Sequence, residues 1–153
     1  MGATLPLPPS GTFQGSLHLF PIRVYYEDTD LSGLVYHANY LRWFERARSD
    51  MLRLLGIDQR AAAENGEGFY TVAELNIRYL APAKLDDAVT VATTPVELRS
   101  ASVRLQQRAM RDGNVLAEAL VRVGFISPEG RPRRQPPGWR AQFETLLPAK
   151  DPA

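Results

Sequence analysis

Four strand-like segments follow one another in the second half of the chain, and no helix-like segment separates them. The first and last of these segments alternate apolar with polar side chains, which is typical of strands with one buried face. The four segments are residues 69–79, 88–98, 101–110 and 115–126. Asp112-Gly113, between the last two, indicates a tight hairpin turn. Because consecutive strands without intervening helices pair antiparallel, a Rossmann-type parallel sheet is excluded.

The first half of the chain contributes one long helix. Apolar residues between Asn39 and Leu55 recur at steps of three and four, which places them on one helical face. Asn39 is the expected N-cap, and Gly56 is the expected glycine after the C-terminus. A strand over 19–27 precedes this helix, and a short helix over 58–65 follows it. These elements predict an α+β domain in which a curved five-stranded antiparallel sheet wraps around the long helix.

Prolines mark the edges of this domain. Eight of the 12 prolines lie before residue 21 or after residue 128. We therefore expect a flexible Pro/Gly arm over 1–17, the folded domain over 18–128, and a linker with a short C-terminal helix over 129–153. Trp139 and Phe143 are spaced as on one face of that helix.

Composition excludes several classes of protein. The 153 residues include 18 Lys and Arg against 17 Asp and Glu, so the basic excess of a nucleic-acid-binding protein is missing. No cysteine is present, which excludes disulfides, thiolate metal sites and cysteine nucleophiles. Residues 1–22 contain neither the basic start of an export signal nor enough apolar residues for a membrane span. The expectation is a cytoplasmic protein.

The stretch from Tyr25 to His37, YYEDTDLSGLVYH, is the candidate for chemistry. It carries three acids, Glu27, Asp28 and Asp30, together with one of the two histidines of the chain. It joins a predicted strand to the start of the long helix, where free N–H groups and the helix dipole can stabilise an oxyanion. The combination predicts a carboxylate that acts beside a polarised carbonyl group.

Other interpretations of these residues stay open. Asp28 and Gly33 also suit a turn before a helix. A metal site formed by Asp28, Asp30 and His37 lacks a second nearby histidine, so no metal is expected. Glu45 is a further acidic candidate, but an ion pair with an arginine at helical spacing, Arg42 or Arg48, is the favoured interpretation.

The run VYYEDTDLSGLVYHANYLRWFERARSDMLR resembles the signature of hotdog-fold acyl-CoA thioesterases of the 4-hydroxybenzoyl-CoA thioesterase family. The family's bacterial Tol-Pal-associated branch is the most similar one. The family pattern D-x-D-x-x-G, then His-x-x-Tyr, then Phe-Glu-x-Ala-Arg matches residues Asp28, Asp30, Gly33, His37, Tyr40, Phe44, Glu45, Ala47 and Arg48. The later stretch 78–87 resembles the family's second strand and its turn, and the likeness covers about residues 19–128.

The resemblance implies a hotdog fold, in which the sheet wraps around a central helix, and a homodimer or homotetramer with its sites at the dimer interface. The implied reaction is hydrolysis of an acyl-CoA or acyl carrier protein thioester, without a cofactor. Asp30 matches the catalytic carboxylate, either as nucleophile or as general base on water. The backbone N–H of His37 matches the group that polarises the thioester carbonyl, and Tyr36 and Gly33 shape the substrate loop.

Two further expectations follow from the substrate and from the family. Coenzyme A carries phosphates, so a basic rim is expected, and Arg99 with Ser100 is the favoured contact among the arginines of the strands and the tail. Among proteins with the hotdog fold, the alternatives to a thioesterase are a dehydratase and a non-catalytic acyl-binding or scaffold protein. The dehydratase motif surrounds its histidine with proline and glycine, which neither His18 nor His37 has.

Overall fold

The computed structural model of the chain describes residue 2 and residues 4–148. The elements in chain order are β1 (Thr12–Gln14), β2 (Leu17–Arg23), the 3₁₀ turn η1 (Tyr26–Asp28), α1 (Asn39–Leu54), α2 (Gln59–Glu64), β3 (Phe69–Tyr79), β4 (Ala88–Leu98), β5 (Ser102–Arg111), β6 (Asn114–Ile126) and α3 (Pro137–Leu146). None of the helices within the described residues is long and apolar enough to span a membrane.

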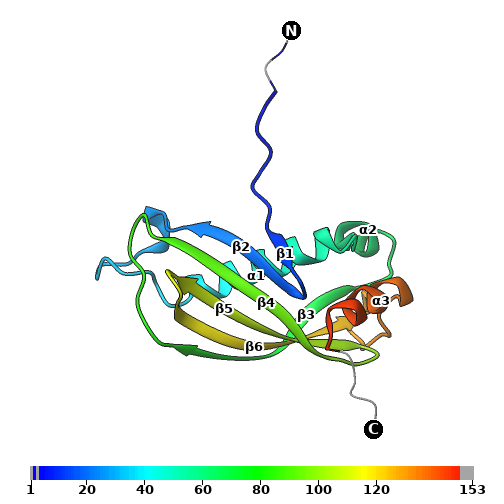
Figure 1. Cartoon of the computed structure of the whole chain (residues 1–153). Helices are drawn as coiled ribbons and strands as arrows, with labels where there is room; N and C mark the ends of the chain where they lie inside the picture. Colours follow the sequence, from blue (N-terminus) through cyan, green and yellow to red (C-terminus); the bar gives the residue numbers. More distant parts are fainter. Residues whose placement is uncertain (1, 3, 149–153) are drawn as a thin grey trace.

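All strands belong to one antiparallel sheet of order β1-β2-β4-β5-β6-β3. The sheet curves around α1, which packs against β2, β4 and β5 (Figure 1). The predicted α+β arrangement is therefore confirmed. The sheet has six strands instead of the predicted five, because β1 forms a hairpin with β2.

The buried face of α1 forms the centre of the core. Trp43, Phe44, Ala47 and Met51 are at most 1% exposed, and they recur at the three- and four-residue steps read from the sequence. Full burial of each large apolar side chain contributes roughly 1.5–3 kcal/mol. This face therefore holds the sheet and the helix together.

The structure confirms the prediction for the C-terminal end of α1 and contradicts the prediction for its N-terminal end. Gly56 follows the C-terminus with φ +78°, as predicted for a glycine in the left-handed region. The prediction that Asn39 caps the N-terminus is wrong, because Asn39 is the first helical residue and Ala38 precedes it. The Asn39 amide instead donates to Asp28 Oδ1 at 2.8 Å. The Asn39 side chain thus ties the start of α1 to the preceding loop, and no side chain caps the helix among the described residues.

The strand predicted over 19–27 is shorter than expected. β2 ends at Arg23, and the chain then turns through η1. The other strands and α2 lie within one residue of their predicted ends. The hairpin turn at Asp112-Gly113 is confirmed, with φ of +50° and +80°.

The N-terminal arm is anchored close to the domain, which corrects the expected boundary at residue 18. Residues 4–9 extend away from the domain (Figure 1), but β1 pairs with β2. Ser10 Oγ and the Gly11 N–H both donate to the Asp50 carboxylate at 2.8 Å, and His18 Nε2 lies 2.8 Å from Asp50 Oδ2. A Cβ at Gly11 would lie 2.2 Å from Leu19 O. Glycine at this position allows a close approach of two backbones.

The C-terminal segment closes one end of the core. Phe143 on α3 is fully buried, which confirms the predicted helix. The irregular linker before α3 is tied to the sheet through Gln135, which is 1% exposed. The Gln135 amide donates to Arg99 O at 2.8 Å, and its Oε1 accepts the Tyr70 hydroxyl hydrogen.

Strand β3 forms an edge of the sheet. It pairs with β6 on one side only. The sequence predicts a half-buried strand, but nearly all of β3 is exposed, including Val72, Leu75 and Tyr79. An edge of this length with apolar side chains is able to pair with another strand.

We expect Asp50→Ala to lower the free energy of unfolding by about 2–4 kcal/mol, because it leaves three donors without their acceptor. Burial raises the pKa of Asp50, but hydrogen bonds from Ser10, Gly11 and His18 outweigh that effect and hold the pKa below 3.8. The stabilisation from Asp50 is thus present above about pH 4 and is lost as the pH falls through the lowered value.

Urea unfolding between pH 3 and pH 7 measures both effects. Glu129→Ala, an exposed substitution, is the control and should change the stability by less than about 0.5 kcal/mol. An Asp50→Ala protein as stable as the parent at pH 7 would contradict the anchoring role.

Candidate active site

Asp28 holds the loop between β2 and α1 in place. Its side chain is 5% exposed, and Oδ2 accepts the Tyr25 N–H at 2.8 Å while Oδ1 accepts the Asn39 amide. Its carbonyl oxygen accepts the Tyr36 N–H at 2.8 Å. The turn-forming interpretation of Asp28 is therefore confirmed. Both carboxylate oxygens are occupied by the chain's own donors.

Asp30 lies at the tip of the same loop and is exposed. Its carbonyl accepts the Gly33 N–H at 3.0 Å, and its N–H donates to Leu34 O at 3.1 Å, so the tip is a small hairpin. Gly33 takes φ +80°, which a side chain would strain. Hydrogen bonds from the Ser32 side chain and backbone lower the pKa of Asp30. Within one chain, Asp30 is an ionised, solvent-facing carboxylate.

His37 lies two residues before the first helical residue and is exposed. Within the described residues its backbone N–H donates to no protein acceptor. Its carbonyl oxygen accepts the Tyr79 hydroxyl hydrogen at 2.8 Å. The imidazole packs against the Tyr36 ring, with centroids 4.5 Å apart. The backbone of His37 is held in place while its N–H stays available.

A hollow open to solvent adjoins Asp30, and its other lining residues are Tyr26, Thr29, Leu31, Gly33 and Leu85. Tyr26 and Leu31 are among the most exposed large apolar side chains of the chain. In the part of the chain that the structure describes, no three His, Asp or Glu side chains gather as a metal site would require. The hollow offers a carboxylate beside apolar surface.

Arg99 and Ser100 lie at the other end of the sheet from this loop. Arg99 follows β4, whereas the loop follows β2 at the opposite end of β4, where Arg23 pairs with Ala88. An 11-residue strand is about 33 Å long, so one chain does not bring the two predicted groups together. Arg99 forms an ion pair with Glu97.

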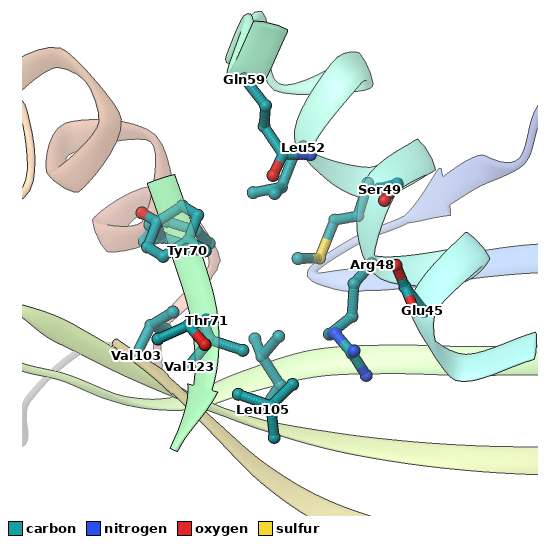
Figure 2. Close-up of a pocket in the computed structure, with 13 residues that line it drawn as sticks. Glu45, Arg48, Ser49, Leu52, Gln59, Tyr70, Thr71, Val103, Leu105 and Val123 are labelled. Atoms are coloured by element: carbon teal, nitrogen blue, oxygen red, sulfur yellow. The ribbon is translucent and has the colours of Figure 1, made fainter. Parts of the chain in front are cut away.

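A cavity of about 270 Å³ lies at this second end of the molecule, between α1 and β3. Figure 2 shows Glu45, Arg48 and Ser49 on one side of it and Tyr70 and Thr71 on the other. Its apolar lining consists of Met51, Leu52, Val72, Val103, Leu105, Val123 and Phe143. The favoured ion pair of Glu45 with Arg42 or Arg48 is absent from the described residues, and Glu45 faces solvent.

The sequence did not identify two residues that contribute to these sites. Tyr79 holds the His37 carbonyl from 42 residues away, and Gln107 binds Arg48 from 59 residues away. No local spacing signals either contact, because both depend on how β3 and β5 lie beside α1. The only available signal for Gln107 is a polar residue among the apolar positions of a predicted strand.

Comparison with known proteins shows which family this chain is similar to. Residues 24–144 match the model of the thioesterase-like superfamily. The chain is 45% identical to the acyl-CoA thioesterase YbgC of Haemophilus influenzae over 70% of this chain and 79% of that protein. It is 39% identical to the acyl-CoA thioester hydrolase YbgC of Escherichia coli over 84% of this chain and 97% of that protein.

A solved structure agrees with these sequence relatives. The probable thioesterase from Bartonella henselae superposes with a TM-score of 0.76 at 38% identity, over 78% of this chain and 99% of that chain. The family match covers the loop, α1 and strands β3 to β6, and together with the solved structure it confirms the predicted hotdog fold.

Proposed function

The chain belongs to the thioesterase-like superfamily, and we propose that it hydrolyses acyl-CoA thioesters to a free acid and coenzyme A. Its similarity to proteins named acyl-CoA thioesterases in Haemophilus influenzae and Escherichia coli supports this reaction. The single structural observation that carries the proposal is the pairing of a free carboxylate, Asp30, with the available N–H of His37 on one rigid loop. An acyl carrier protein is the alternative thiol carrier, and an association with the Tol-Pal system stays a prediction.

The different burial and hydrogen bonding of the two aspartates support Asp30 as the reacting acid. Asp28 is buried and binds Tyr25 and Asn39, so the fold shields it from a substrate. Asp30 keeps Oδ2 free and faces the open hollow. Asp30 either attacks the thioester carbonyl directly, which expels the coenzyme A thiolate and leaves an acyl anhydride that water then hydrolyses, or it takes a proton from a water that attacks the carbonyl and displaces the thiolate.

The His37 N–H is the proposed oxyanion donor. A backbone N–H aimed at the carbonyl oxygen stabilises the negative charge that develops during attack. The Tyr79 hydroxyl fixes the peptide on the other side of His37, and Tyr36 packs against its ring. Gly33 and Tyr36 thus shape the loop that presents this donor.

A second copy of the chain completes the proposed site. Two β3 edges that pair antiparallel about their midpoint bring Tyr79 of each chain opposite Phe69 of the other. The loop held by Tyr79 then approaches the other chain's Tyr70 and Thr71, which line the cavity. The same pairing moves Arg99 and Ser100 of one chain toward Asp30 of the other, where they would contact coenzyme A.

Pairing also changes the chemistry of Asp30. In one chain the hydrogen bonds from Ser32 keep its pKa low and solvent surrounds it. Cover by a second chain and by the acyl group removes water, which raises a carboxylate pKa and makes the group a better base or nucleophile. The homodimer, alone or paired into a tetramer, is therefore part of the proposed mechanism.

We predict that Asp30→Asn folds normally and loses at least about a hundredfold in turnover, because a positioned acid or base contributes on that scale. Release of free thiol from acyl-CoA measures the rate. Glu27→Gln removes the same charge from an exposed position of the same loop and is the control. Near-parental hydrolysis by folded Asp30→Asn would remove Asp30 from the mechanism.

A pair of His37 variants separates backbone from side chain. His37→Ala keeps the N–H and should lose activity only modestly, whereas His37→Pro removes the donor and should cost roughly 10²–10³ in rate. Thiol release and circular dichroism are measured on both proteins. Equal loss in two folded variants would mean that the imidazole itself does chemistry.

The dimer is tested at the free edge of the sheet. We expect Leu75→Lys on β3 to yield inactive monomers, because lysine on an edge strand opposes edge pairing. Leu120→Lys on the neighbouring β6 is the control, since Leu120 is 40% exposed against 37% for Leu75. Light scattering gives the oligomeric state, and an active monomeric parent protein at micromolar concentration would refute the shared site.

A further inference from the structure

Arg48 places a positive charge at the cavity between α1 and β3, whose lining combines polar and apolar side chains. Figure 2 shows its side chain reaching from α1 toward Leu105 on β5. Burial lowers the pKa of Arg48, and the charge of nearby Glu45 partly opposes that effect. Within the described residues, no carboxylate oxygen lies within 4 Å of the guanidinium. A half-buried cation without a direct ion pair is a costly arrangement.

A network behind Arg48 holds the guanidinium in this position. Arg48 Nη1 donates to Gln107 Oε1 at 3.0 Å. Gln107 is fully buried, and its Nε2 donates to Phe44 O at 2.9 Å and to Thr93 Oγ1 at 3.0 Å. These two acceptors fix the orientation of the amide, so its oxygen faces Arg48. Because this contact uses one of five guanidinium N–H groups, donors remain for a ligand.

We propose that Arg48 selects acyl groups that carry an anionic oxygen, such as a carboxylate, at the end distant from the thioester. Such a group supplies the missing counter-ion and accepts hydrogen bonds from the free N–H groups. The aliphatic part of the acyl chain lies against Leu52, Leu105 and Val123. Glu45 does not oppose this selection strongly, because it is exposed and water screens its charge.

The size of the cavity fits this class of acyl group. About 270 Å³ is more than the roughly 150 Å³ of an apolar cavity that admits benzene. This space can hold part of a medium-length chain, and Arg48 lies on the α1 side of it.

This inference rests on the proposed function, since the acyl group reaches the cavity from the catalytic loop of a second copy. The thioester lies at Asp30 and His37 of one chain, and the far end of its acyl group lies at Arg48 of the other. Arg48 is thus a specificity-determining residue, and the reacting atoms stay with Asp30.

The experiment compares hexanoyl-CoA with adipoyl-CoA, which have the same chain length and differ by a terminal carboxylate. The parent protein should favour adipoyl-CoA in kcat/KM. Arg48→Leu should lower kcat/KM for adipoyl-CoA by roughly ten- to a hundredfold and leave that for hexanoyl-CoA within about threefold, the size of a lost charge-assisted hydrogen bond. Arg48→Lys keeps the charge and should retain part of the preference.

Arg60→Leu is the matched control, because the Arg60 side chain is 88% exposed and, among the residues that the structure describes, forms an ion pair with Glu64 alone. It should leave both substrates unchanged. Light scattering and circular dichroism verify that each variant is a folded dimer, and Arg48→Gln replaces Arg48→Leu if the latter does not fold.

Two results would overturn the inference while the proposed function stands. One is a parent protein that hydrolyses hexanoyl-CoA at least as well as adipoyl-CoA. The other is an equal loss on both substrates in Arg48→Leu, or dissociation of its dimer, which would make Arg48 a structural residue. A parent protein that releases no thiol from any acyl-CoA would instead overturn the proposed function, and the role of Arg48 with it.

Discussion

The burial of one face of α1 inside the curved sheet is the constraint on which the rest of the structure depends. Trp43, Phe44, Ala47 and Met51 are almost completely removed from solvent, and the strands bend around them. This packing sets the direction of α1, and thereby the place where the preceding loop begins its turn. It also leaves Glu45 and Arg48, on the neighbouring face of the same helix, beside a cavity instead of in bulk solvent or in the core.

The loop before α1 works because its two aspartates have different surroundings. Asp28 is buried and bonded to Tyr25 and Asn39, so it fixes the path of the chain. Among the described residues, Asp30, two residues later, is bonded only within its own turn, and its carboxylate is exposed. The Tyr79 hydroxyl then ties the loop to β3. A hydrogen-bonded frame therefore carries the exposed carboxylate that we propose as the reacting group.

One chain provides two incomplete sites at opposite ends of its sheet. The loop has a carboxylate and, among the described residues, a backbone N–H without an acceptor, but little cover, whereas the cavity has Arg48 and more cover. The free edge of β3 connects the two, because Tyr79 and Tyr70 lie near its ends. In the proposed dimer, the pairing of the two β3 strands buries their apolar side chains and removes water from around Asp30. The same pairing brings the acyl group next to Arg48.

The sequence by itself determined the elements whose signals are local. The periodicity of residues 39–55 and the patterns of the four later strands predicted α1 and β3 to β6 to within one residue, whereas β1 was missed and the ends of β2 were misplaced. The motif around Asp30 and His37 singled out the loop before α1 as the candidate site. Only the tertiary structure decided that Asn39 binds Asp28, that Asp50 anchors β1, that β3 is exposed, and that Gln107 supports Arg48. Periodicity reports which face of an element is apolar. It carries no information on which distant polar group meets that element, because such contacts depend on how the elements pack in space.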